Sequence, residues 1–279
     1  MNTAKKTKRR FITLLLSVIS VLYVLPVVII LVNSFKKKAY ISKEPFSFPS
    51  GKMFVGFENY ISGVERTQFF NSLFWSVFIT VGSVAVIILC TSMCAWYIVR
   101  SNSVFCKVLY LLFVFSMIVP FQMVMFTLSK TADTLNLNTP WGIIIIYLGF
   151  GAGLAVFMFT GFVKGVPVQI EEAAMIDGCS PLQTFFRIVL PILKPTCISV
   201  AILETMWIFN DYLLPYLVLD IRKYKTIPIA IQYLKGGYGS IDMGAMMAML
   251  VLSIIPIIIF YISLQKYIIK GVVAGAVKG

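Results

Sequence analysis

The sequence predicts an all-α, polytopic membrane protein, and three observations support that prediction. Of the 279 residues, 59% are hydrophobic and only 13% are charged, whereas a water-soluble domain of this size has about a quarter of its residues charged. The apolar residues also gather into runs of about 20, the length that a helix needs to cross the hydrocarbon core of a bilayer. Because lipid cannot satisfy an open backbone, each run is expected to be a helix.

Six membrane-spanning helices are predicted along the chain. They cover approximately residues 11–32, 72–99, 104–128, 141–163, 196–217 and 243–268. Pro120 lies inside the third of these spans. The fourth holds Gly149, Gly151 and Gly153, which are small enough to let another helix approach closely.

The N-terminal basic residues set the expected orientation. Five Lys and Arg residues lie between Lys5 and Arg10, and positive charge beside the first span favours the cytoplasmic side. A cleaved signal peptide is not favoured, because the apolar run that follows is too long and no A-x-A site ends it. We therefore expect residues 1–10 to be a cytoplasmic basic tail, 11–270 a six-span membrane domain and 271–279 a cytoplasmic C-terminal tail.

The net charge of +13 does not point to nucleic acid. The basic residues lie in short clusters at the ends of apolar runs, where snorkelling and membrane lipid explain them. The chain has five cysteines and no histidine. Cys90 and Cys94 would share a helix face, yet no histidine or carboxylate lies near them to complete a metal site. We expect no metal site and no catalytic residues.

One polar segment, EEAAMIDGCSPLQTFFRIVLP at residues 171–191, departs from the apolar pattern. It belongs to the loop 164–195 between the fourth and fifth spans, which the expected orientation places in the cytoplasm. Pro167 in a first turn and Gly178 as a left-handed stop predict one short helix. Ser180 and Gln183 predict a capping box on a second helix, which Pro191 is expected to end.

The two short helices are expected to form a helix-turn-helix with an apolar and a charged side. The apolar side would carry Ile170, Ala173, Ala174, Phe186, Ile188 and Leu190. A loop that only linked two spans would not need two caps and two stops. The segment is therefore interpreted as a docking site for another protein. The alternative is an interfacial helix that rests on lipid headgroups.

The segment resembles the cytoplasmic coupling motif of permease subunits of binding-protein-dependent ABC importers. The resemblance extends over essentially the whole chain, in NSFKKK, ENYISG, NSLFWSVFITV, MIVPFQ, LNLNTPWG and WIFNDYLLP. The C-terminal GVVAGAVKG is similar to the tail of the shorter membrane subunit of maltose-type carbohydrate importers. The resemblance implies that the chain forms half of a translocation path for a sugar or oligosaccharide in a bacterial-type cell membrane.

The resemblance also implies the coupling residues and the partners. The segment 167–191 would sit in a groove of an ATPase subunit through Glu172, Ala173, Ala174, Asp177, Gly178 and Pro191. Glu171 lies about 100° around the helix from Glu172, so both cannot enter one groove. The implied partners are a second, longer permease, two ATPase subunits and an extracytoplasmic sugar-binding protein. The chain itself lacks a G-x-x-x-x-G-K-[ST] sequence, so ATP and Mg are expected on the partner ATPase and no cofactor in this chain.

Two carboxylates, Glu204 and Asp211, fall inside the fifth predicted span. A charged group there costs at least about 2.5 kcal/mol unless it faces protein or water. Seven residues apart on a helix, they would share a face with Trp207, Asn210 and Tyr212 nearby. These five residues are the candidates for lining the substrate path. The alternative is polar pairing at the interface with the partner permease.

The external segment 220–242 would touch the sugar-binding protein by resemblance, or would be an ordinary solvated loop. Two other classes of function are less favoured. A secondary transporter driven by protons or sodium fits poorly with six spans, no histidine and so few buried acids. A membrane-embedded enzyme would need paired acids, a serine–histidine set or metal ligands in facing spans. A requirement for ATP and a separate nucleotide-binding protein would distinguish an ABC permease from both.

Overall fold

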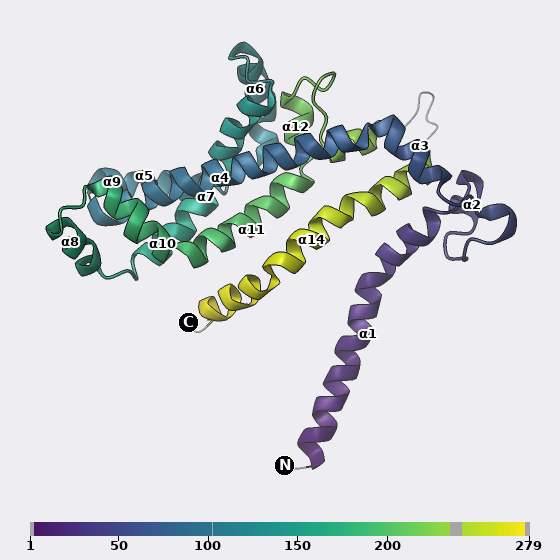
Figure 1. Cartoon of the computed structure of the whole chain (residues 1–279), viewed down its shortest axis with the longest axis horizontal. Helices are drawn as coiled ribbons and strands as arrows, with labels where there is room; N and C mark the ends of the chain where they lie inside the picture. Colours follow the sequence, from purple (N-terminus) through teal and green to yellow (C-terminus); the bar gives the residue numbers. More distant parts are fainter. Residues whose placement is uncertain (1–2, 102, 235–241, 277–279) are drawn as a thin grey trace. The chain divides into compact units, whose positions relative to one another are not determined.

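A computed structural model of the chain describes the backbone of residues 3–101, 103–234 and 242–276, with the side chains of residues 9–267 within those ranges. The elements in chain order are α1 (Thr3–Asn33), α2 (Lys38–Lys43), η1 (Gly51–Met53), α3 (Glu58–Thr67), α4 (Phe69–Ser101), α5 (Val104–Ser116), α6 (Phe121–Thr134), α7 (Pro140–Val163), α8 (Val168–Ile176), α9 (Pro181–Thr184), the π-helical turn η2 (Phe185–Val189), α10 (Leu190–Ile192), α11 (Lys194–Asn210), α12 (Leu213–Val218), α13 (Ile227–Gln232) and α14 (Met243–Ala276). Figure 1 shows this succession of helices. The all-α prediction is confirmed for these ranges, where the β-pairing is one isolated bridge between Lys36 and Phe54.

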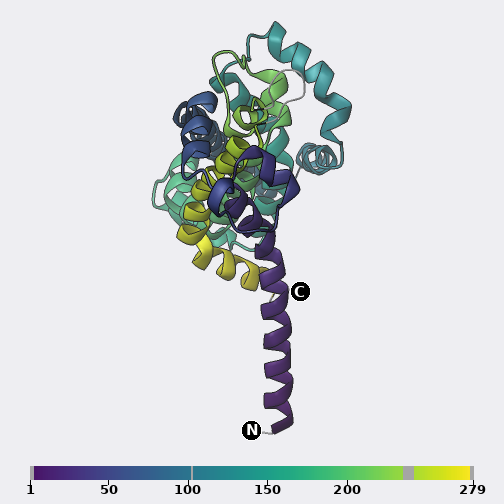
Figure 2. The same ribbon diagram turned by 90° about the vertical axis from the view of Figure 1, so that its right-hand side faces the viewer.

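Four stretches of continuous helix are long and apolar enough to cross a membrane. They are Arg9–Asn33, Phe69–Ser101, Pro140–Val163 and Met243–Tyr267. Two bent helix pairs raise the number to six if each pair is one span. The first, second, fourth and sixth predicted spans are therefore uninterrupted helices, and Figure 2 shows α1 drawn out as a single helix.

The third predicted span is broken, so its prediction as one continuous helix was wrong. The helices α5 and α6 meet at an angle of 102°. Pro120 is the N-cap residue of α6, with an extended ψ of 134°. Proline has no N–H to donate to the preceding turn and disfavours helical geometry in the residue before it. The chain therefore ends one helix at Ser116 and starts the next at Phe121.

The fifth predicted span is also interrupted. The helix α11 ends at Asn210, and Asp211 has an extended backbone with ψ of 127°. The Oδ1 atom of Asp211 accepts hydrogen bonds from the backbone N–H groups of Leu213 and Leu214, at 3.0 and 3.4 Å. The carboxylate thus satisfies the first two N–H groups of a new helix start, which have no partner within the helix. The short helix α12 begins immediately after it.

The chain divides into two compact units, and the first contains residues 1–70 and 230–258. Beyond the end of α1 the chain folds back on itself through polar side chains. Asn33 donates to the carbonyl of Pro45 at 2.8 Å, and the Nζ atom of Lys36 donates to the carbonyl of Glu44 at 2.8 Å. Asn59 in α3 donates to the carbonyls of Ser34 and Lys36. These hydrogen bonds hold the segment that follows α1 in a compact conformation.

The second unit contains residues 71–229 and 259–279, and α7 runs through its hydrophobic core. A Cβ atom on Gly151 would lie 2.6 Å from Ile87 of α4, and one on Gly153 would lie 2.8 Å from the carbonyl oxygen of Phe113 in α5. Close helix approach is thus confirmed at both glycines. Gly149 has no neighbour within 4 Å of that position, because it lines an apolar cavity of about 600 Å³ beside the α5–α6 bend.

Candidate functional site

The polar segment folds as two short helices, and the first of them, α8, is bounded by Pro167 and Gly178 as predicted. Pro167 is the N-cap residue of α8, and Gly178 follows its C-terminus with φ of +86°. The Gly178 and Cys179 N–H groups donate to the carbonyls of Met175 and Ala174, at 3.1 and 3.0 Å. A left-handed residue that closes a helix with such backbone bonds is a C-terminal stop, which confirms the expectation for Gly178.

The second short helix begins with the expected capping box. The hydroxyl of Ser180 accepts a hydrogen bond from the N–H of Gln183 at 3.3 Å, and the Gln183 side-chain oxygen accepts one from the N–H of Ser180 at 2.8 Å. The helix does not end at Pro191, however. It widens into the π turn η2, runs through α10 to Ile192, and only then bends by 74° into α11. The wider turn relieves the clash that proline makes with the preceding carbonyls.

The buried side of this segment differs from the predicted apolar side. Ile170 and Ala173 are exposed, and Ile176 of α8 is 85% exposed. The buried residues of α8 are instead Glu171, which is 2% exposed, and Ala174. The buried side of α8 therefore shares Ala174 with the apolar side named from the sequence, but it includes the Glu171 carboxylate in place of Ile170 and Ala173. Of the predicted coupling residues, Glu172, Ala173, Asp177 and Gly178 are exposed, whereas Ala174 packs against its own chain.

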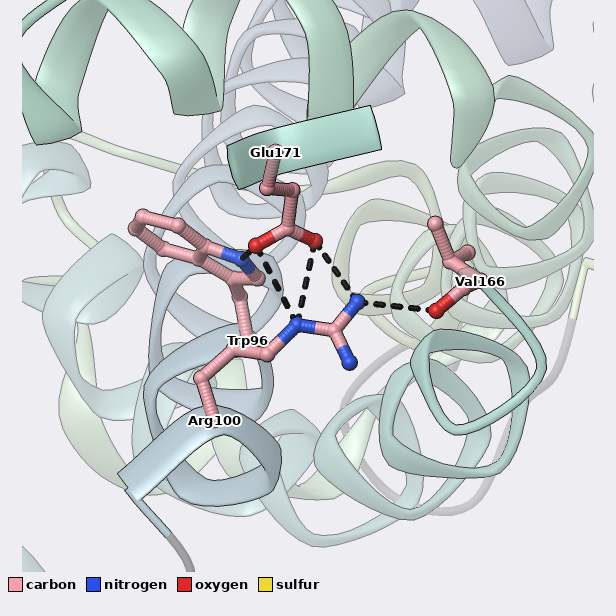
Figure 3. A network of polar contacts seen from close by, with 4 residues as sticks. All are labelled: Trp96, Arg100, Val166 and Glu171. Carbon is pink, nitrogen blue, oxygen red and sulfur yellow. Dashed lines mark hydrogen bonds and ion pairs between the residues drawn. The ribbon is translucent and has the colours of Figure 1, made fainter. Parts of the chain in front are cut away.

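The carboxylate of Glu171 is held by two side chains of α4 (Figure 3). Its Oε1 atom accepts from Nη2 of Arg100 at 2.6 Å and from Nε at 3.0 Å. Its Oε2 atom accepts from Nε1 of Trp96 at 2.8 Å and from Nε of Arg100 at 3.1 Å. Arg100 also donates through Nη2 to the carbonyl of Val166 at 3.0 Å. An arginine pairs with a carboxylate in this forked way more specifically than lysine does.

The sequence reading missed this pairing. Glu171 and Arg100 are 71 residues apart, so no local pattern joins them. The available signal was the i, i+4 spacing of Trp96 and Arg100 at the end of an apolar run, which places both donors on one helix face. A carboxylate in the polar segment could accept hydrogen bonds from both donors, but the segment contains three acids, and the sequence does not show which of them does so.

The residues proposed for the substrate path fall into two groups. Glu204 is 2% exposed and lies where α11 meets α7, with its Oε2 atom 3.0 Å from the Cβ position of Gly151. That oxygen accepts no hydrogen bond from the residues that the structure describes. Asp211, in contrast, lies beyond the end of α11. The expectation that both carboxylates share one helix face was therefore wrong.

The second group gathers around Tyr147 of α7. Its hydroxyl donates to Oδ2 of Asp211 at 3.1 Å, and its ring meets the Trp207 ring edge to face at 5.5 Å. Asn210 turns its amide back to the carbonyl of Met206 at 2.7 Å, and Tyr212 stacks on Tyr216 with ring centroids 5.2 Å apart. Trp207 and Asn210 are exposed. Asp211 thus has structural partners, while Trp207 and Asn210 remain accessible.

Four membrane-length helices, with two bent helix pairs that could each form a further span, define a multi-pass helical membrane protein. The chain belongs to the family of inner membrane components of binding-protein-dependent transport systems, whose sequence profile matches residues 87–273.

Relatives and a solved structure agree with this family. The chain is 36% identical over 271 residues, 97% of each chain, to a probable starch degradation products transport system permease protein of Thermoanaerobacterium thermosulfurigenes. It is 34% identical over 95% of each chain to a multiple sugar-binding transport system permease protein of Streptococcus mutans. A melibiose/raffinose/stachyose import permease protein of Bacillus subtilis is 30% identical over the full length of both. The fold matches a bacterial ABC transporter involved in the import of alginate, with a TM-score of 0.79, 19% identity, and coverage of 96% of this chain and 98% of that one.

Proposed function

We propose that this chain is one of the two permease subunits of an ABC importer for a sugar or oligosaccharide. These relatives are named for the transport of starch degradation products, of multiple sugars, and of melibiose, raffinose and stachyose. Their shared class of cargo supports a carbohydrate substrate here. The partners are a second, longer permease, two ATPase subunits that carry ATP and Mg, and an extracytoplasmic sugar-binding protein. Both chain termini lie in the cytoplasm.

The observation that supports coupling through residues 167–191 is the division of α8 into two sides. One side is used internally, since Glu171 and Ala174 are buried. The other side exposes Glu172, Ala173 and, at the end of the helix, Asp177. A short helix with a small residue beside an exposed carboxylate suits a groove that carries basic side chains. Gly178 lets the chain turn back at once, so the exposed side projects from the protein.

Trp207 and Asn210 are the strongest candidates for contact with the sugar. Sugar rings stack on flat aromatic side chains, and Trp207 is partly exposed beside an accessible amide. Tyr212 lies next to them in the chain. Asp211 acts on the path indirectly, as the group that starts α12 and positions Tyr147. Glu204 is buried between helices, so its contribution to the path is through helix packing.

Import into proteoliposomes tests the proposal. The complex would contain this chain, the second permease and the ATPase, with ATP enclosed and binding protein plus labelled oligosaccharide outside. We expect uptake that requires ATP, the ATPase and the binding protein together. Accumulation driven by a proton or sodium gradient without the ATPase would contradict the proposal and favour a secondary transporter.

A further inference from the structure

The carboxylate of Glu171 joins parts of the chain that are distant in sequence. Glu171 lies in the first turn of α8, while Trp96 and Arg100 lie one turn apart at the end of α4. The ion pair is largely enclosed, with the Glu171 and Arg100 side chains 3% and 22% exposed. A partly buried ion pair is screened by salt much less than an exposed one, and the forked arginine–carboxylate contact adds geometric specificity.

The same guanidinium fixes α8 at two points. Besides the carboxylate, Arg100 binds the carbonyl of Val166, which immediately precedes the N-cap residue Pro167. The entry to α8 and its first turn are therefore both attached to α4. Because two separated attachments define a direction as well as a position, α8 cannot rotate independently of the end of α4.

A third element joins the same cluster. The ring of Trp96, which donates to Glu171, also lies 5.5 Å from the ring of Phe185, the first residue of the π turn. Phe185 is completely buried. The cluster of Trp96, Arg100, Glu171 and Phe185 thus connects α8, the π turn that leads towards α11, and the membrane-length helix α4.

We propose that Glu171 and Arg100 are positioning residues that transmit movement of α8 to α4, in addition to the covalent route through α7 and α11. This inference rests on the proposed docking of α8 to the ATPase. Glu172 would contact the ATPase on the outer side of α8, and Glu171 would carry the displacement inward. The two adjacent carboxylates therefore have different tasks: one binds the partner and the other connects the helix to the membrane domain.

The test compares Glu171→Gln with Glu172→Gln in the reconstituted importer. The first readout is the amount of ATPase that co-purifies with the permeases. The second is the amount of sugar imported per ATP hydrolysed, which assembly alone does not change. We expect Glu171→Gln to retain the ATPase but to import about tenfold less sugar per ATP, the factor that corresponds to losing one charge-assisted hydrogen bond. We expect Glu172→Gln to lower ATPase retention instead.

A second variant covers the case in which Glu171→Gln does not assemble. Trp96→Phe removes one N–H donor to Glu171 while it keeps an aromatic ring beside Phe185 and the ion pair with Arg100. We expect a smaller fall in sugar imported per ATP, of a few-fold. Glu65→Gln removes an exposed carboxylate elsewhere and should leave this ratio unchanged.

The outcomes separate the inference from the proposed function. An unchanged ratio in Trp96→Phe, or in an assembled Glu171→Gln complex, would overturn the transmitting role. If Glu172→Gln impairs uptake while the two other variants do not, docking stands and only the inference fails. If neither Glu171→Gln nor Glu172→Gln affects retention or uptake, the proposed docking of α8 fails with it.

Discussion

The hydroxyl of Tyr147 donates a hydrogen bond to the carboxylate of Asp211 at 3.1 Å, and the other oxygen of that carboxylate accepts from the N–H groups of Leu213 and Leu214 at the start of α12. Tyr147 is completely buried in α7. One acidic side chain therefore accepts hydrogen bonds both from the start of the helix that follows the break after α11 and from a buried hydroxyl. This double use explains why an acid occurs at this position within an apolar run.

Replacement of Asp211 should reveal this structural role. Asp211→Ala removes the acceptor of two N–H groups at the start of α12, worth about 0.5–1.5 kcal/mol for each hydrogen bond lost. It also leaves the Tyr147 hydroxyl buried without this partner, which costs about 1–3 kcal/mol. We expect a clear fall in the thermal unfolding temperature of the purified complex. Asp211→Asn keeps an acceptor oxygen for the N–H groups of α12 and should retain most of the stability. Equal stability of Asp211→Ala and wild type would contradict this structural role.

Two glycines of α7 offer a matched pair. A Cβ atom on Gly151 would meet Ile87 at 2.6 Å and Glu204 at 3.0 Å, whereas one on Gly149 would meet nothing within 4 Å. Gly151→Ala should destabilise the complex by about 1–3 kcal/mol through overpacking. Gly149→Ala should be neutral or slightly stabilising, because alanine favours the helix. Thermal unfolding of both variants measures the difference, and the reverse order would disprove the close approach at Gly151.

Gly178 tests the turn between α8 and α9. Its φ of +86° suits glycine, and the space around it is open, so a larger side chain meets only backbone strain. Gly178→Val should cost about 1 kcal/mol or more. We expect assembly to survive while ATP-driven uptake falls. Gly178→Asn should be milder, since asparagine tolerates left-handed geometry. Normal uptake by Gly178→Val would show that this turn does not matter for coupling.

The exposed carboxylate Glu172 tests docking. If it forms a charge-assisted contact with the ATPase, Glu172→Ala should cost roughly 1.5–3 kcal/mol of coupling between the subunits. Sugar-stimulated ATP hydrolysis and uptake should fall together, while the sugar affinity of the binding protein stays unchanged. Gln169→Ala changes another exposed residue of α8 and serves as the control. Equal, small effects of both variants would indicate that α8 is only an interfacial linker.

Lys36 gives a pH-dependent prediction. Burial lowers the pKa of Lys36, and the nearby charge of Glu44 opposes this effect in part. The unfolded chain therefore holds the proton at pH values between the lowered pKa and 10.5. In that window the unfolded state binds more protons, so the contribution of Lys36 to the free energy of unfolding increases as pH rises.

Unfolding temperatures of wild type and Lys36→Met, measured at increasing alkaline pH up to 10.5, would check this sign. We expect wild type to gain stability relative to Lys36→Met as the pH rises. Lys37→Met changes an adjacent exposed lysine and should show no such trend. A wild-type advantage that shrinks with rising pH would contradict the burial of a charged Lys36.

The sequence by itself determined that the chain is a helical membrane protein, where its apolar runs lie, and where α8 and α9 of the polar segment begin and α8 ends. A bilayer selects helices of a certain length, and caps such as Ser180 with Gln183, or a stop such as Gly178, act over a few residues. Such short-range signals can be identified directly from the sequence, because all of their residues are near one another in the chain. The family resemblance could be recognised for the same reason, because its motifs are short and contiguous.

Only the tertiary structure decided which carboxylate of the polar segment turns inward and where the fifth predicted span breaks. Glu171 is buried because Trp96 and Arg100 lie about seventy residues earlier in the chain and meet it in space. Asp211 lies at the break after α11, where its carboxylate accepts hydrogen bonds from the hydroxyl of Tyr147 and from the N–H groups at the start of α12. Hydrogen bonds satisfy both oxygens of the Glu171 and Asp211 carboxylates. The distant partners Trp96, Arg100 and Tyr147 in these bonds are not part of any local sequence pattern.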